Sequence, residues 1–287
     1  MYESDIKGNV SPWVLNEGIP AREDLHDTLQ AVYVWSRPEN IDNSKVNLEA
    51  AVEFVKRRYE KYKLEPEPLK SYDSSFILLA LHSYLKNNDD KVLEDIENYA
   101  KNYLSTYFRN GPAHNAREYS NPYWKATMLF LNLRDSGEDA QFLSSWLSKD
   151  ISLPNPENEE VHKGPGYIYP HDFFSTFGTK LYAINTISPQ LIPKNIEQLI
   201  PSGFITRSID PTIFNASVLY GLCTLSNEMM ALLNGKVQSA IESIFKVLES
   251  NFVEGGTKRG DYVNIRESFS TFFVYFAELL REKKEIF

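Results

Sequence analysis

The chain has 287 residues, of which 42% are hydrophobic and 24% charged, proportions typical of a globular protein with a sizeable core. Thirty basic against thirty-nine acidic side chains give a formal net charge of −9, which disfavours binding to nucleic acid or to an anionic membrane surface. The single cysteine, Cys223, excludes an intrachain disulfide and a metal site built on cysteine pairs.

Six segments along the chain share one pattern, in which turn residues and an acid or an amide head a helical run of apolar side chains. The acid or amide favours a helix N-terminus, because it caps the first turn or interacts with the helix dipole. The segments are about 48 residues apart on average, which is the spacing of a helical repeat. They begin at Asp27, Asp73, Asn121, Asp172, Asp210 and Glu267.

A second kind of helix is predicted between these segments. Each has one apolar stripe at three- and four-residue steps and charged side chains on the opposite side, as expected of a half-buried helix. The runs headed by the acids are instead apolar nearly all round and should be covered on both sides. The amphipathic helices are predicted over Asn43–Lys63, Asp90–Phe108, Glu138–Lys149 and Lys236–Phe252, with a shorter one over Lys194–Ile200.

The alternation of buried and half-exposed helices predicts an all-α fold. At this period the arrangement expected is an (α/α)6 toroid of about six helical hairpins, with an inner ring of helices inside an outer set. An open α-solenoid also stacks helix pairs and is the structural alternative. No low-complexity linker divides the sequence, because the stretches around Pro66 and Pro154 are typical of loops between hairpins. We therefore expect a single α/α-toroid domain over residues 1–287.

The repeat resembles that of the protein prenyltransferase β-subunits and of the squalene and terpene cyclases, whose toroids repeat a glycine-rich turn, an acid and an inner helix. The best local match is Gly255–Arg259, with the sequence GGTKR, followed by Arg266 and Glu267 at a helix start. We expect the segment from Gly255 to Asp261 to be an exposed loop. A weaker copy is Gly166–His171. The resemblance implies an isoprenoid-binding or isoprenoid-processing protein in which a diphosphate is held by Lys258, Arg259 and Arg266.

Two motifs of those families are absent from this sequence. The prenyltransferase zinc ligands include a cysteine two residues after the helix-start acid, where this chain has Phe269 after Glu267. Cys223 lies more than three turns beyond Asp210, at the wrong end of its helix to replace it. The DxDD motif of the cyclases does not occur either. We therefore expect no bound metal and no cofactor.

The helix-start acids are the candidates for catalysis. In a toroid the inner N-termini would meet at one mouth, which their dipoles make attractive to anions. Each acid could equally cap its own helix and have no catalytic role. Asp73 and Asp172 are the stronger candidates, because a carboxyl group crowded by aromatic side chains can stay protonated and act as a general acid. The predicted catalytic residues are Asp73, Asp172 and His171.

Aromatic side chains are abundant, with 17 tyrosines, 17 phenylalanines and 4 tryptophans. Most should fill the space between helix layers. Rings that line a cavity would suit an isoprenoid chain or a carbocation, and they would equally suit the face of a sugar. The predicted substrate-binding members are Tyr167, Tyr169 and Trp124.

Three functions from different classes are therefore open. The first is an isoprenoid-type protein that binds a hydrophobic small molecule, for example a prenyl diphosphate. The second is a non-catalytic toroid scaffold that binds a protein partner. The third is an (α/α)6 carbohydrate-active enzyme that uses paired carboxylates as acid and base.

The sequence also predicts where the protein resides. Its N-terminal segment, MYESDIKGNV, has neither the basic region nor the apolar run of a signal peptide. No apolar run approaches the ~18 residues that span a bilayer. We therefore expect a cytoplasmic protein without a membrane span.

Overall fold

The structure is a computed structural model in which the chain divides into two compact units, residues 1–140 and residues 141–286. Each unit has a core of its own and is described by itself. The structure describes residues 2–3, 10–11, 25–64, 71–110, 122–133, 137–148, 170–192, 196, 211–232, 235–253, 256–259, 262–264 and 268–283.

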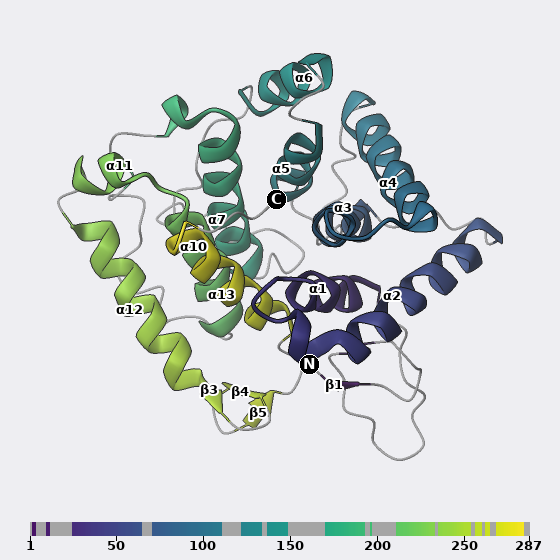
Figure 1. The fold of residues 1–287 in the computed structure, drawn as a ribbon. Coiled ribbons are helices and arrows are strands. Elements are labelled where there is room, and N and C mark those ends of the chain that lie inside the picture. Colours follow the sequence, from purple (N-terminus) through teal and green to yellow (C-terminus); the bar gives the residue numbers. More distant parts are fainter. Residues whose placement is uncertain are drawn as a thin grey trace. The chain divides into compact units, whose positions relative to one another are not determined.

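The first unit is built around three neighbouring apolar helices. Helix α3 packs against α1 and α5, and the amphipathic helices α2 and α4 pack against α1 and α3, respectively (Figure 1). Two short strands, β1 and β2, form an antiparallel pair. The elements are β1 (Tyr2–Glu3), β2 (Val10–Ser11), α1 (Leu25–Trp35), α2 (Ile41–Leu64), α3 (Ser71–Leu85), α4 (Lys91–Arg109) and α5 (Pro122–Leu133).

Burial separates the two kinds of helix in this unit. All residues from Asp73 to Leu81 in α3 are buried, which requires neighbours on every side of the helix. In α4 the buried apolar residues recur every three or four positions and end with Phe108, while Val92 and Tyr99, which flank this stripe, are exposed. The distinction between buried and amphipathic helices was therefore predicted correctly for α3 and α4.

The second unit repeats this arrangement. Helix α10 packs against the apolar helices α7 and α13 and against the amphipathic helix α12. Aromatic side chains of α7, α10 and α13 pack on one another. The ring centroids of Tyr220 and Phe273 are 4.6 Å apart, and those of Tyr182 and Phe276 are 5.6 Å apart. The helices are α7 (Pro170–Ile187), α10 (Pro211–Cys223), α11 (Asn227–Leu232), α12 (Lys236–Asn251) and α13 (Ser268–Arg281), with a 3-10 turn at Pro189–Leu191.

The all-α class and the six predicted helix starts are confirmed. The helices predicted to begin at residues 27, 73, 121, 172, 210 and 267 begin at residues 25, 71, 122, 170, 211 and 268, differences within the usual uncertainty of helix ends. Helix α6 (Gly137–Ser148) also matches its prediction, whereas the short helix over Lys194–Ile200 lies largely outside the described residues. The toroid and the single domain stay predictions.

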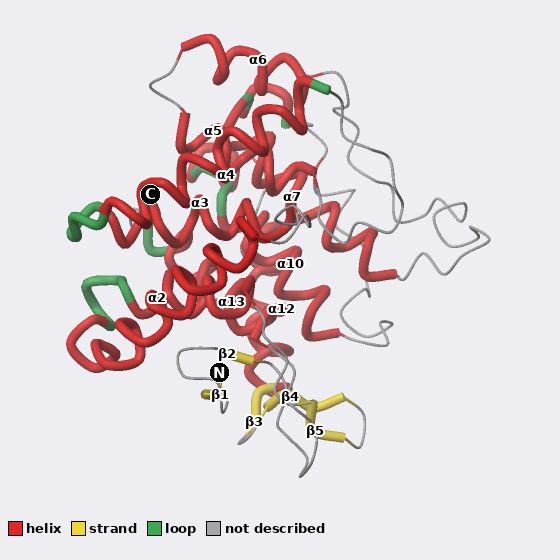
Figure 2. The backbone as a smooth tube through the Cα atoms, turned by 90° about the vertical axis from the view of Figure 1, so that its right-hand side faces the viewer, coloured by secondary structure: helices red, strands yellow, loops and turns green. Residues whose placement is uncertain are grey.

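One local prediction was wrong. The segment from Gly255 to Asp261 was expected to be an exposed loop, but it contains strand β4 (Gly256–Arg259). This strand pairs in antiparallel fashion with β3 (Phe252–Val253) and β5 (Tyr262–Asn264). Figure 2 shows the strands in yellow, and β3 follows α12 directly in the sequence. A glycine pair followed by two basic residues gives no alternation of apolar and polar residues, so the strand has little sequence signal.

None of the helices that the structure describes is long and apolar enough to cross a membrane.

Candidate functional site

A histidine and two carboxylates meet where α1 packs against α3. The Nε2 atom of His26 lies 3.4 Å from Oδ1 of Asp27, its neighbour in α1. The Nδ1 atom of the same ring lies 4.0 Å from Oδ1 of Asp73 in α3. Each nitrogen of one imidazole therefore has a carboxylate oxygen close to it. We refer to His26, Asp27 and Asp73 as the His26 cluster.

The three members of the His26 cluster differ in their exposure. The side chain of His26 is 29% exposed, whereas those of Asp27 and Asp73 are only 2% and 8% exposed. Buried carboxylates are costly unless they are paired or hydrogen-bonded, and the imidazole supplies a partner that both can share. The imidazole ring is therefore the exposed part of the cluster, and the two carboxylates are buried.

The local sequence explains why both acids lie at this place. Asp27 and Asp73 are each the third residue of their helix, where the positive end of the helix dipole stabilises a negative charge. Because α1 and α3 pack side by side, two such first turns are brought together. The acids lie within the first turn rather than at the N-cap position.

Aromatic rings adjoin the His26 cluster. The ring of Phe76, one turn after Asp73, has its centroid 6.5 Å from that of His26. Trp124 of α5 lies behind it, with its centroid 5.8 Å from that of Phe76. Phe76 and Trp124 are 1% and 4% exposed, so this side of the cluster is the apolar core of the unit.

A buried amide lies one turn further along α1. Gln30 is 0% exposed, and neither its side-chain oxygen nor its side-chain nitrogen has a hydrogen-bond partner in the part of the chain that the structure describes. Asn215 in α10 of the second unit is equally buried and has the same lack of hydrogen bonds. Such groups are rare in folded proteins and call for an explanation.

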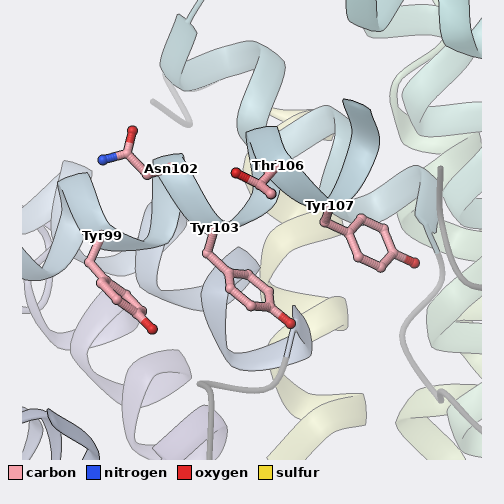
Figure 3. Close-up of a pocket in the computed structure, with 5 residues that line it drawn as sticks. All are labelled: Tyr99, Asn102, Tyr103, Thr106 and Tyr107. Carbon is pink, nitrogen blue, oxygen red and sulfur yellow. The ribbon is translucent and has the colours of Figure 1, made fainter. Parts of the chain in front are cut away.

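A groove lies on α4 in the first unit. It has a volume of about 350 Å³, and the described residues that line it all belong to this helix. Figure 3 shows three tyrosine rings projecting from the same side of α4, one turn apart. The last of them, Tyr107, has the Nζ atom of the fully buried Lys125 4.6 Å from its ring centroid. The lining residues are Tyr99, Asn102, Tyr103, Thr106 and Tyr107.

The sequence-predicted site residues fall into two groups. Asp73 lies in the His26 cluster, and Trp124 is a buried core residue beside it. The backbones of His171 and Asp172 lie in the first turn of α7, but their side chains are outside the described part of the structure. The side chains of the remaining predicted site residues are not described either. Lys258 and Arg259 belong to β4 without described side chains, and Tyr167, Tyr169 and Arg266 lie outside the described residues.

Two residues of this region were not among the predicted site residues. His26 is the first of them, and its ring lies close to both Asp27 and Asp73. Gln30 carried a usable signal, because it is a long polar side chain inside the otherwise apolar run DTLQAVYVW. A polar residue at a position that must be buried points to a role other than packing.

Neither a metal site nor a reactive thiol stands out in the described residues. They contain no group of three or more histidine, cysteine, aspartate or glutamate side chains that could hold a metal ion. Burial raises the pKa of the Cys223 thiol to about 12, against a smaller opposing effect of the positive charge on Arg281. A thiol in this state is a poor nucleophile.

Comparisons of the chain with models of protein families, with curated proteins and with solved structures found no match.

Proposed function

We propose that the protein binds a hydrophobic small molecule of the isoprenoid type and that His26 transfers a proton to it. The position of the His26 ring carries the proposal. The ring is part-exposed, and each of its nitrogens faces a buried carboxylate. Opposite charges at this distance stabilise the protonated ring. A positioned imidazolium is the commonest general acid in enzymes.

The surroundings of His26 support an apolar ligand. The buried rings of Phe76 and Trp124 lie on one side of the cluster, and aromatic rings near a site can stabilise the positive charge that develops on a protonated isoprenoid. The two carboxylates disfavour an anion beside His26. Binding of a diphosphate group by Lys258, Arg259 and Arg266 is a separate proposal.

The proposal is tested by titration calorimetry with farnesyl diphosphate and, in parallel, with inorganic pyrophosphate. We expect farnesyl diphosphate to bind more tightly, because its apolar tail contributes separately from its head. His26→Ala should weaken farnesyl diphosphate binding. It should also abolish any conversion of the ligand that product analysis detects.

His82→Ala is the matched control for this experiment. His82 is 31% exposed, and its Nδ1 atom lies 3.3 Å from a carboxylate oxygen of Glu97, so it resembles His26 in exposure and in having a carboxylate beside its ring. His82 differs from His26 in its position, because it lies in the last turn of α3. Equal losses of binding in the two variants would argue against a specific role of His26. No binding at millimolar farnesyl diphosphate would leave the scaffold function ahead.

A carbohydrate-active enzyme is the second candidate. The observation that favours it is the approach of Asp27 and Asp73 to the same imidazole, because paired carboxylates at one site are the working groups of glycoside hydrolases. Short oligosaccharides titrated under the same conditions distinguish the two functions. Binding of an oligosaccharide without binding of farnesyl diphosphate would replace the isoprenoid proposal by this one.

A further inference from the structure

The groove on α4 carries a row of tyrosine rings. Tyr99, Tyr103 and Tyr107 follow one another at four-residue steps, so successive rings are about 6 Å apart along the helix axis. Figure 3 shows all three on one side of α4. Tyr99 is 40% exposed, and the other two are half-buried. Single exposed apolar side chains are ordinary, but a contiguous row of them in a groove indicates a binding surface.

Polar side chains form a second row beside the rings. Asn102 and Thr106 are also one turn apart, and each lies three positions after a tyrosine, which makes it a neighbour of that ring on the helix surface. Both residues are exposed. An amide has N–H donors and a carbonyl acceptor, and a hydroxyl group both donates and accepts. A ligand that lies on the rings can therefore form hydrogen bonds along one of its edges.

The charges around the groove favour a neutral ligand. None of the described residues that line it is charged, so no described cationic side chain of the lining could pair with an anion. Aromatic rings also bind cations such as quaternary ammonium groups. However, the Nζ atom of the buried Lys125 already lies 4.6 Å from the ring centroid of Tyr107. A second positive charge at that ring would be repelled by the first, which disfavours a cationic ligand.

We propose that this groove binds a neutral oligosaccharide. A sugar ring has a face of C–H groups, which can lie against a tyrosine ring, and a rim of hydroxyl groups, which donate and accept hydrogen bonds. The two rows on α4 offer both kinds of contact and repeat with the turn of the helix, which suits a ligand of repeating units. The groove volume of about 350 Å³ lies within the range of small-molecule sites, about 300–1,000 Å³.

Oligosaccharide binding at this place goes beyond the proposed function and is independent of it, because the described lining of the groove shares no residue with the His26 cluster. Titration calorimetry of the wild type with cellohexaose, maltohexaose and glucose is the first test. We expect at least one hexasaccharide to bind at millimolar concentration and to bind more tightly than glucose, because a longer chain contacts more than one ring. Absence of binding by both hexasaccharides would overturn the proposal, and so would an equal affinity for glucose.

Choline and a proline-rich peptide are the other ligands that aromatic grooves commonly bind. Both are titrated into the wild type under the same conditions. Binding of either one without binding of a hexasaccharide would assign the groove to that ligand and overturn the saccharide proposal.

Two variants locate the bound oligosaccharide. Asn102→Ala should weaken its binding about two- to tenfold, the effect of one neutral hydrogen bond. Asn98→Ala is the control, because Asn98 is an exposed asparagine one turn earlier on α4, outside the groove lining. Tyr103→Leu removes the central ring and should have a similar effect, about two- to tenfold. Its control is Tyr84→Leu, a half-buried tyrosine of α3. Far-UV circular dichroism checks that each variant is folded, and unchanged binding in both groove variants would overturn the proposal.

The His26→Ala variant separates the groove from the His26 cluster, because a carbohydrate-active enzyme would also bind an oligosaccharide. Loss of hexasaccharide binding in His26→Ala but not in Asn102→Ala or Tyr103→Leu would assign the sugar to the His26 cluster and overturn the groove site. The reverse pattern supports the groove. Binding of farnesyl diphosphate should not change in Asn102→Ala, so failure of the saccharide site would leave the isoprenoid proposal in place.

Discussion

Gly221 of α10 lies against the backbone of Gly178 of α7. A Cβ atom placed on Gly221 would lie 2.8 Å from the Cα atom of Gly178 and closer still to its carbonyl oxygen. Because the obstacle is backbone rather than a flexible side chain, the two helices can approach this closely only without a side chain at Gly221. The neighbouring pair, Thr179 and Tyr220, joins the same helices by a buried hydrogen bond between their hydroxyl groups.

Gly221→Ala should therefore destabilise the second unit. The added methyl group forces α7 and α10 apart, and overpacking of this kind costs about 1–3 kcal/mol. The free energy of unfolding, measured by urea denaturation, reports the loss. Gly235→Asn is the control, because Gly235 has open space around it and a φ of 76°, which asparagine tolerates. Equal stability of Gly221→Ala and the wild type would show that the helices are not held at this distance.

Asp90 joins α2 to the start of α4. Its Oδ1 atom accepts hydrogen bonds from the backbone N–H groups of Val92 and Leu93, and its Oδ2 atom lies 2.6 Å from Nζ of Lys56. Asp90→Ala removes both interactions, and loss of the cap alone costs about 0.5–2 kcal/mol. Asp90→Asn keeps the cap and should cost less, because a part-exposed ion pair contributes at most about 1 kcal/mol. Thermal unfolding of the two variants measures the difference, and equal losses would show that the ion pair, not the cap, is the important contact.

Glu97 should make the stability of the first unit depend on pH in the acidic range. Burial alone would raise its pKa, but the hydrogen bond to His82 and the charge of Lys101 hold the pKa of Glu97 below its ordinary value of 4.5. A carboxylate with a lowered pKa in the folded state stabilises the protein above the ordinary value, and this contribution is lost as the pH falls through the folded pKa.

Glu97→Gln should thus reduce the free energy of unfolding by about 1–3 kcal/mol at pH 7, and its difference from the wild type should shrink below pH 4.5. Urea denaturation over a pH series measures both effects. Asp95→Asn, an exposed position on the same helix, is expected to change stability little at any pH. A Glu97→Gln deficit that stays constant down to pH 3 would contradict the assigned role of its charge.

The helices could be predicted from the sequence because their signals are local. The period of apolar residues and the acids in the first turn lie within each segment, and α3 and α4 could be assigned as buried and amphipathic without their neighbours. The approach of His26 to Asp73 depends instead on how two segments 47 positions apart pack side by side. No single segment carries that information. The burial of Lys125, inside the apolar run after Pro122, likewise depends on the ring of Tyr107 that covers it.

The basic residues of the β3-β4-β5 sheet give the last prediction. If a diphosphate is bound by Lys258 and Arg259, charge-assisted hydrogen bonds of roughly 1.5–3 kcal/mol each are lost when both are replaced by alanine. Farnesyl diphosphate should then bind at least about tenfold more weakly in calorimetry. Because these residues belong to β4 and pair with Val263 and Tyr262 of β5, and alanine is a poor strand residue, we also expect a small loss of stability, of up to about 1 kcal/mol.

Lys236→Ala with Lys246→Ala is the matched control for the Lys258 and Arg259 variant. Both lysines are exposed on α12 in the same unit, and their removal changes the net charge by the same amount. A general electrostatic attraction would weaken in both double variants alike and would fall steeply with added salt. If the site is specific, binding of farnesyl diphosphate would weaken only when Lys258 and Arg259 are replaced. Binding of inorganic pyrophosphate would weaken in the same variant, since the contacts are to the phosphate groups and not to the apolar tail. Unchanged binding of farnesyl diphosphate would remove Lys258 and Arg259 from the site.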